Sequence, residues 1–106
     1  MKRRRTGGQK SDMQWVVIAY DGEDPDAGAR RQKARPAHLE VARRLKEEGR
    51  LHTGGAILDD SGAMVGSVVI VDFPTRAAVD QWLQTDPYAT ENVWQRVEIR
   101  PFRLAL

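Results

Sequence analysis

The hydrophobic residues of the chain recur in two periods, which predict strands alternating with helices. Residues 13–20 (MQWVVIAY) are β-branched and aromatic, which is typical of a strand. Residues 35–49 carry one inward-facing stripe at the i, i+3, i+4 and i+7 spacing of a helix, formed by His38, Val41, Ala42 and Leu45. Pro36 suits the first turn and Gly49 the end, so we expect this helix to begin at about Arg35.

The intervening and following segments complete the pattern. Residues 21–31 are rich in Gly, Pro and Asp and predict a loop. Residues 51–58 and 63–73 predict two strands of a hairpin, joined by the turn sequence Asp59-Asp60-Ser61-Gly62.

A second helix opens at Pro74 and Thr75 and ends before Pro87, because the residue preceding a proline disfavours helical geometry. Its inner face is formed by Ala78, Val79, Trp82 and Leu83. Residues 93–100 alternate apolar and charged side chains and predict the last strand.

The resulting order, β-α-β-β-α-β, is that of an α+β ferredoxin-like domain with a four-stranded antiparallel sheet. Two helices cover one face of such a sheet. The other face is not clearly polar, since the strand at 63–73 carries apolar residues at both odd and even positions, Val68 and Ile70 among them, and so on both faces of the sheet. Exposed apolar faces usually mark interfaces. We therefore expect a homodimer formed through the open sheet face.

Composition limits the classes of function. The 106 residues fit one domain and include no cysteine, which excludes disulfides, thiolate chemistry and zinc sites built on sulfur and fits a cytoplasmic location. No apolar run approaches the length of a membrane span. Residues 1–12 carry a net charge of +4 and predict a disordered basic arm, so the predicted domain at 13–106 carries −2. This distribution argues against a nucleic-acid reader, although the arm could contact an anionic surface.

His38 is the first candidate for chemistry, because it lies on the inner stripe of the first helix. It is either a core histidine with one hydrogen bond or an imidazole lining a pocket, where it could gain and lose a proton near neutral pH. Asp86 is either a turn cap or the partner that orients this imidazole as a base. The predicted topology separates the two, so they meet only if residues 85–92 fold back or if they come from different subunits.

Other polar residues offer substrate contacts. Ser67 interrupts an apolar strand and either packs neutrally or points into a cavity. Arg35 is either solvated or holds an anionic group, and Tyr88 is either a structural wall or a contact. We expect His52 to lie on the surface. No carboxylate cluster accompanies the histidines, so no metal site is expected.

Several short motifs, in this order and spacing, together resemble the YciI-like (YCII-related) family over residues 13–103: Arg35-Pro36-Ala37-His38-Leu39, Glu48-Gly49-Arg50-Leu51, Gly54-Gly55, Gly66-Ser67, Thr85-Asp86-Pro87-Tyr88 and Val97-Glu98-Ile99-Arg100-Pro101-Phe102. The resemblance implies a dimeric α+β barrel with a cavity centred on His38 and Asp86. The sequence departs from the family in its basic arm, in Gly54-Gly55 where members often show Gly-Pro, and in its short link between strands two and three.

The resemblance also implies an activity, because relatives of the family include proteins that act on chlorinated aromatic breakdown products by proton abstraction and halide loss. The sequence thus predicts a small cofactor-independent enzyme of the lyase, isomerase or dehalogenase kind. His38 and Asp86 would be catalytic, and Arg35, Ser67 and Tyr88 would bind a small organic substrate. The alternative is a non-catalytic small-molecule-binding or accessory domain.

Overall fold

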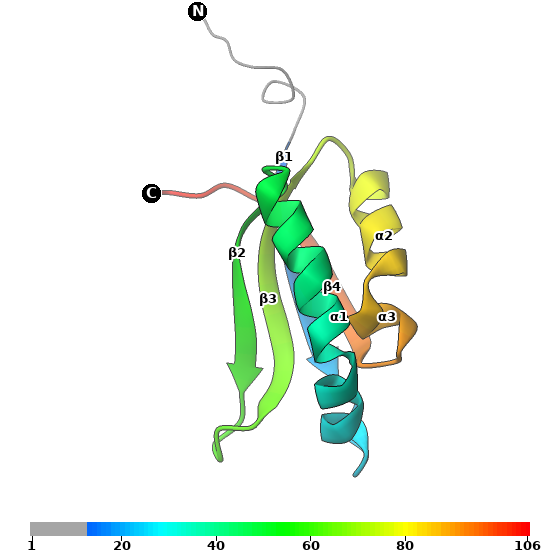
Figure 1. Ribbon diagram of the computed structural model, residues 1–106. Helices are drawn as coiled ribbons and strands as arrows, with labels where there is room; N and C mark the ends of the chain where they lie inside the picture. The colour runs from blue at the N-terminus through cyan, green and yellow to red at the C-terminus, as the bar shows by residue number, and fades with distance from the viewer. Residues whose placement is uncertain (1–12) are drawn as a thin grey trace, which may run out of the picture.

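A computed structural model describes residues 13–106 (Figure 1), and the arm predicted at residues 1–12 lies outside the described residues. Strands and helices follow one another in the predicted order, with a short extra helix before the last strand. The elements are β1 (Met13–Asp21), α1 (Ala27–Glu47), β2 (Leu51–Leu58), β3 (Met64–Phe73), α2 (Arg76–Thr85), α3 (Pro87–Thr90) and β4 (Trp94–Phe102).

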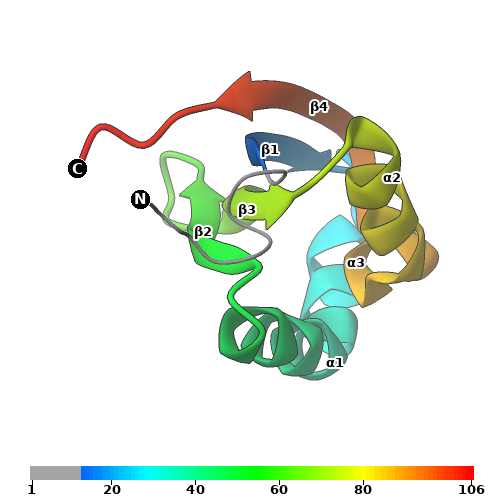
Figure 2. The same cartoon turned by 90° about the horizontal axis from the view of Figure 1, so that it is seen from above.

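The four strands form one antiparallel sheet in the order β2-β3-β1-β4. All three helices lie on the same side of this twisted sheet, and the other side is left open (Figure 2). This is the ferredoxin-like α+β fold that the sequence predicts, and the prediction is confirmed.

The core lies between the sheet and the helices and is divided into two clusters. One packs α2 against the middle of the sheet and consists of Trp15, Val17, Val69, Val71, Val79 and Trp82. The other lies beneath α1 and α3 and consists of Ala19, Ala34, Tyr88, Val93 and Trp94. Trp94 and Tyr88 therefore anchor the end of the sheet where the first helix crosses it.

The start of the first helix was predicted wrongly. Helix α1 begins at Ala27, about two turns before Arg35, and contains Pro36 in its interior, so the helix takes up the last five residues of the loop expected at 21–31. The segment that follows Ala27 is rich in Ala, Arg, Lys and Gln, which are strong helix formers, and their summed preference outweighs the loss of one backbone hydrogen bond at the proline. His38 consequently lies in the middle of a 21-residue helix.

The prediction for His52 was also wrong in part. It is the extra residue where the pairing of β2 with β3 shifts register between Leu51 and Thr53. Its Nε2 lies 2.9 Å from Oδ1 of Asp72, and its side chain is only 32% exposed. The bulge turns the imidazole back toward the neighbouring strand, so His52 is half-buried in a second histidine–aspartate pair.

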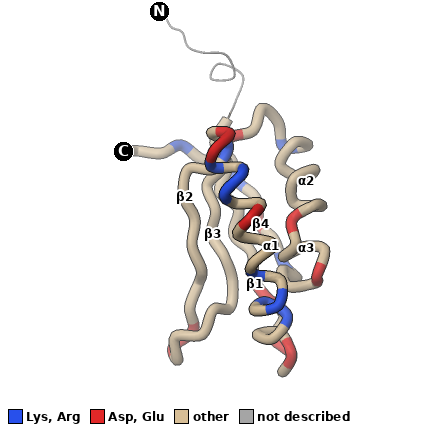
Figure 3. Tube along the Cα trace, viewed as in Figure 1, with Lys and Arg blue, Asp and Glu red and all other residues tan. Residues whose placement is uncertain are grey.

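Charged residues are distributed unevenly over the layers. Strand β2 carries no Lys, Arg, Asp or Glu, whereas α1 carries seven Lys or Arg and two Glu (Figure 3). Strand β2 therefore contributes mostly apolar and small side chains. Within residues 13–106, no helix combines the length and apolar character needed to cross a membrane.

Candidate functional site

His38 and Asp86 meet within one chain. Nδ1 of His38 lies 2.8 Å from Oδ1 of Asp86, and the two side chains are 13% and 1% exposed. The contact forms because α1 extends further toward its N-terminus than predicted, which brings His38 level with the junction of α2 and α3. Residues 85–92, which include α3, turn back onto α1 and stack Tyr88 on His38, so the first of the two possibilities holds and no second subunit is needed.

The local sequence around Asp86 explains why its carboxylate is held in place. Asp86 ends α2 with an extended backbone (φ −70°, ψ 134°), and Pro87 begins α3. Its Oδ1 also accepts a hydrogen bond from the backbone N–H of Tyr88 at 2.9 Å. Asp86 is therefore both a helix cap and the partner of His38, so the two roles that the sequence left open coexist.

The hydrogen bond determines the tautomer of His38. An ionised carboxylate has no proton to donate, so Nδ1 of His38 carries the hydrogen and donates it to Asp86. In the neutral ring Nε2 then has a free lone pair. A ring held this way has the orientation required of a general base.

Two aromatic rings hold the imidazole from other sides. Tyr88 stacks on His38 with ring centroids 3.8 Å apart, and Trp94 meets it edge-on at 5.6 Å. Burial raises the pKa of the Tyr88 phenol, so Tyr88 keeps its proton well into the alkaline range. It therefore faces the site as a neutral ring with a hydroxyl donor.

Sequence reasoning missed Arg31, which is a central residue of the site. Nη1 of Arg31 donates to both carboxylate oxygens of Asp21, at 2.9 and 3.0 Å, and Nη2 donates to Oγ of Ser67 at 3.0 Å. The two ion-pair side chains are 4% and 3% exposed. Arg31 also lies over the Tyr88 ring, 4.6 Å from its centroid. The signal was present, because Ala27, Arg31, Ala34 and His38 share one helix face.

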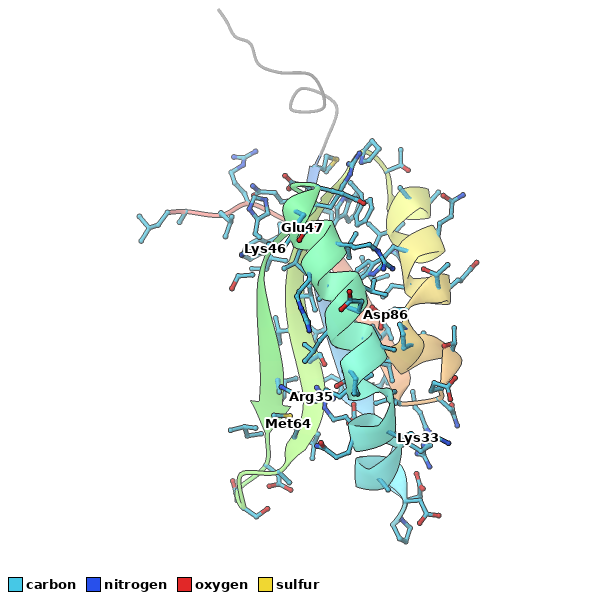
Figure 4. The ribbon with its side chains drawn as sticks, in the orientation of Figure 1. Lys33, Arg35, Lys46, Glu47, Met64 and Asp86 are labelled. Atoms are coloured by element: carbon cyan, nitrogen blue, oxygen red, sulfur yellow. The ribbon has the colours of Figure 1, made fainter. Side chains whose placement is uncertain are left out.

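A cavity of about 230 Å³ lies between α1 and the sheet, and it is lined by all five predicted site residues. Ser67 is buried at its sheet wall. Arg35 extends from α1 toward β2 and β3, on the side of Met64, while Lys33 points the other way (Figure 4). The cavity also contacts these residues: Arg31, Leu39, Ala42, Leu45, Leu51, Gly54, Gly55, Ala56, Met64, Val69 and Trp82.

The described residues include no group of three or more His, Asp or Glu side chains close enough to hold a metal ion. The polar side chains that line the cavity are one imidazole, one carboxylate, two guanidinium groups, two hydroxyl groups and one indole.

The fold and the site together define a ferredoxin-like domain with a histidine–aspartate pair beside a small cavity. A family model described as YCII-related domain matches residues 13–103. Protein YciI of Escherichia coli O6:H1 is 36% identical over 94 residues, which cover 83% of this chain and 96% of that protein. The chain belongs to the YCII-related domain family, and the resemblance found in its motifs is confirmed.

Solved structures with the same fold are more distant in sequence. The 5-chloro-2-hydroxyhydroquinone dehydrochlorinase of Burkholderia phenoliruptrix, in complex with 2,5-dihydroxybenzoquinone, superposes with a TM-score of 0.75 at 21% identity, covering 86% of this chain and 94% of that one. A dimeric ferredoxin-like protein from Jannaschia superposes with a TM-score of 0.52 at 13% identity, covering 87% and 99%. At these identities the likeness concerns the fold.

Proposed function

We propose that this protein is a small acid–base enzyme that needs no cofactor and acts on a small organic molecule in the cavity. His38 Nε2 takes a proton from the substrate and returns it to the product or to the leaving group. Asp86 holds the ring in position and stabilises the imidazolium that forms. The observation that carries the proposal is the 2.8 Å contact of His38 with a nearly fully buried carboxylate at the wall of a cavity.

The reaction type that suits these groups is proton abstraction followed by loss of a group or by a shift of a double bond, as in a lyase, an isomerase or a dehalogenase. A lone base can drive these steps when the anion that forms is stabilised. The fold neighbour from Burkholderia is a dehydrochlorinase, which supports this class without giving the substrate of the present chain. Arg35, Ser67 and Tyr88 would contact the substrate.

The test compares two histidine–aspartate pairs of the same chain. His38→Gln should lower turnover of a panel of small cyclic and chlorinated acids and 5-chloro-2-hydroxyhydroquinone by roughly 10²–10⁴-fold. His52→Gln is the matched control, because His52 also pairs with an aspartate, at 2.9 Å, but does not line the cavity. Wild-type turnover by a folded His38→Gln protein would exclude the role of His38. Saturable binding with no turnover by any variant would favour a non-catalytic binding domain.

We also propose that the open sheet face joins two copies of the chain. Val16 and Ile18 of β1 lie directly opposite Ile70 and Val68 of β3, and this block is not covered by any helix of residues 13–106 (Figure 2). Two solved structures with this fold are described as dimeric, which supports the proposal. Apolar side chains on an uncovered sheet face gain stability when a second sheet removes them from water.

Light scattering during size-exclusion chromatography tests the dimer. The wild-type chain should have twice the mass of the 12.0 kDa monomer. Ile18→Glu should shift it to the monomer, because an unpaired carboxylate would be buried in the interface. Gln84→Glu, which adds the same charge on the exposed side of α2, should stay dimeric. A monomeric wild-type protein would contradict the proposal.

A further inference from the structure

The cavity wall offers hydrogen-bond donors in excess of acceptors, and Ser67 shows this most clearly. Its oxygen accepts one hydrogen bond from Arg31 Nη2 at 3.0 Å and another from Trp94 Nε1 at 3.1 Å. A hydroxyl has two acceptor lone pairs and one hydrogen, so both lone pairs are engaged. The Ser67 hydrogen is left to donate, and no acceptor for it lies among residues 13–106.

Two further donors of the cavity lining are buried without an acceptor among the described residues, namely Nε of Arg31 and Nε1 of Trp82. Buried polar groups without partners are costly and uncommon, so their gathering around one cavity calls for an explanation. Neither nitrogen is itself accessible from the cavity, so the two N–H groups add positive partial charge to its wall and are not direct contacts for a ligand.

Arg35 adds a charge to this set. It is half-buried, lines the cavity, and has no ion-pair or hydrogen-bond partner among residues 13–106. Asp86 is the one carboxylate of the lining, and its Oδ1 already accepts from His38 and from the Tyr88 backbone. Arg31 is matched by Asp21, so Arg35 is the cation of this wall with no acidic partner in the described part of the chain.

We infer that the cavity binds a small organic oxyanion, with the charged oxygen on the Arg35 guanidinium and the Ser67 hydroxyl. This inference deepens the proposed function and rests on the same cavity. Arg31 and Trp94 act as positioning residues, because they occupy the lone pairs of Ser67 and so force its hydrogen outward. The volume of about 230 Å³ suits a six-membered ring with a few substituents, since a cavity of about 150 Å³ already holds benzene.

The arrangement also suits the chemistry proposed for His38. When its Nε2 removes a proton from a neutral or singly charged substrate, the electron pair passes to an oxygen of the substrate and creates an enolate or a phenolate. A guanidinium and a fixed hydroxyl donor stabilise that oxygen without having to reorient. The same two groups would hold a carboxylate in the resting complex, so carboxylates can serve as probes of the site.

The experiment measures binding of small aromatic and alicyclic carboxylates, each compared with its neutral amide, by calorimetry on the full chain. Benzoate and benzamide form the first pair. The carboxylate should bind at least about tenfold more tightly than the amide, because hydrogen bonds to charged groups are stronger than neutral ones. If no carboxylate of the panel binds better than its amide, the inference is wrong.

Variants assign the effect to the proposed residues. Arg35→Met should remove the preference for the carboxylate, and Ser67→Ala should weaken carboxylate binding by about tenfold. Lys33→Met is the matched control on the same helix, since Lys33 points away from the cavity (Figure 4), and it should bind as the wild type does. Equal losses in Lys33→Met and Arg35→Met would indicate a non-specific charge effect and overturn the inference.

The His38→Gln variant separates this inference from the proposed function. It keeps Arg35 and Ser67, so it should still prefer carboxylate over amide even though it cannot transfer the proton. A wild-type protein that binds carboxylates but turns over none of the test substrates would refute the enzyme proposal and leave the oxyanion site standing. Loss of the preference in His38→Gln would instead show that the donors proposed here do not carry it.

Discussion

Replacing Asp21 with alanine would leave the Arg31 guanidinium buried without the carboxylate that neutralises it. Nη1 of Arg31 contacts both Asp21 oxygens at 2.9 and 3.0 Å, and the side chains are only 4% and 3% exposed. Breaking a buried pair by removing one partner typically costs about 3–5 kcal/mol, because the remaining charge has lost both water and its partner. Since a small domain is stabilised by about 5–15 kcal/mol in all, this loss is a large share.

Urea denaturation followed by tryptophan fluorescence measures the effect. For a small protein the free energy of unfolding falls by about 1–3 kcal/mol per molar urea, so a loss of about 3–5 kcal/mol in Asp21→Ala should lower the midpoint by roughly 1–5 M. Protein concentration must be held constant, because dimer formation would couple stability to it. Asp24→Ala is the matched control: Asp24 pairs with Arg30, next to Arg31 on α1, but this pair is exposed. Its midpoint should hardly move.

A double replacement tests the reasoning about charge. Arg31→Met combined with Asp21→Ala removes both charges, so the double variant should be more stable than Asp21→Ala alone, despite carrying one more substitution. The claim that the buried guanidinium depends on this carboxylate is refuted if Asp21→Ala lowers the free energy of unfolding by less than about 1 kcal/mol. It is also refuted if the loss in the double variant equals the sum of the losses in Asp21→Ala and Arg31→Met.

Three further outcomes are expected. The Arg30 guanidinium lowers the pKa of the Asp24 carboxyl to about 2. The contribution of this pair to the free energy of unfolding is therefore present above pH 3.8 and is lost as the pH falls through about 2. Arg30→Gln should return the pKa of Asp24, measured by NMR titration, toward 3.8. Burial raises the pKa of Tyr88, so its phenolate absorbance should appear above the usual pH of about 10 and be absent from Tyr88→Phe. The stability linked to the phenol proton should be lost as the pH rises through that raised pKa. Gly66→Ala should cost about 1–3 kcal/mol in thermal or urea unfolding, because its Cβ would lie 2.5 Å from a carbonyl oxygen of β1, whereas Gly55→Ala, with nothing within 4 Å of the added atom, should be tolerated.

Local patterns predicted most of the architecture. The β-branched run of β1 and the Asp59–Gly62 turn depend on interactions between residues close in sequence, so they can be read without the fold. Gly49 ends α1 as expected and has a positive φ of 75°, which glycine adopts without strain. The start of α1 was missed because Pro36 was given more weight than the helix-forming residues that precede it.

The site was predicted in part. His38 on an apolar helix face and Asp86 before a proline are both visible in the sequence, and the structure brings them into contact. Their catalytic roles, and the binding roles of Arg35, Ser67 and Tyr88, remain predictions. Arg31 was passed over because an arginine on a helix is usually solvated, and the apolar period alone does not distinguish a buried arginine from an exposed one.

The sequence by itself determined the order of strands and helices, the uncovered sheet face and the presence of one imidazole and one carboxylate able to pair. Only the tertiary structure decided which charges are buried together. Arg31 finds its acceptors 10 residues before it, in Asp21, and 36 residues after it, in Ser67. A guanidinium can be buried only when such partners arrive from other strands, and that depends on how the sheet and α1 pack together, which no local pattern encodes.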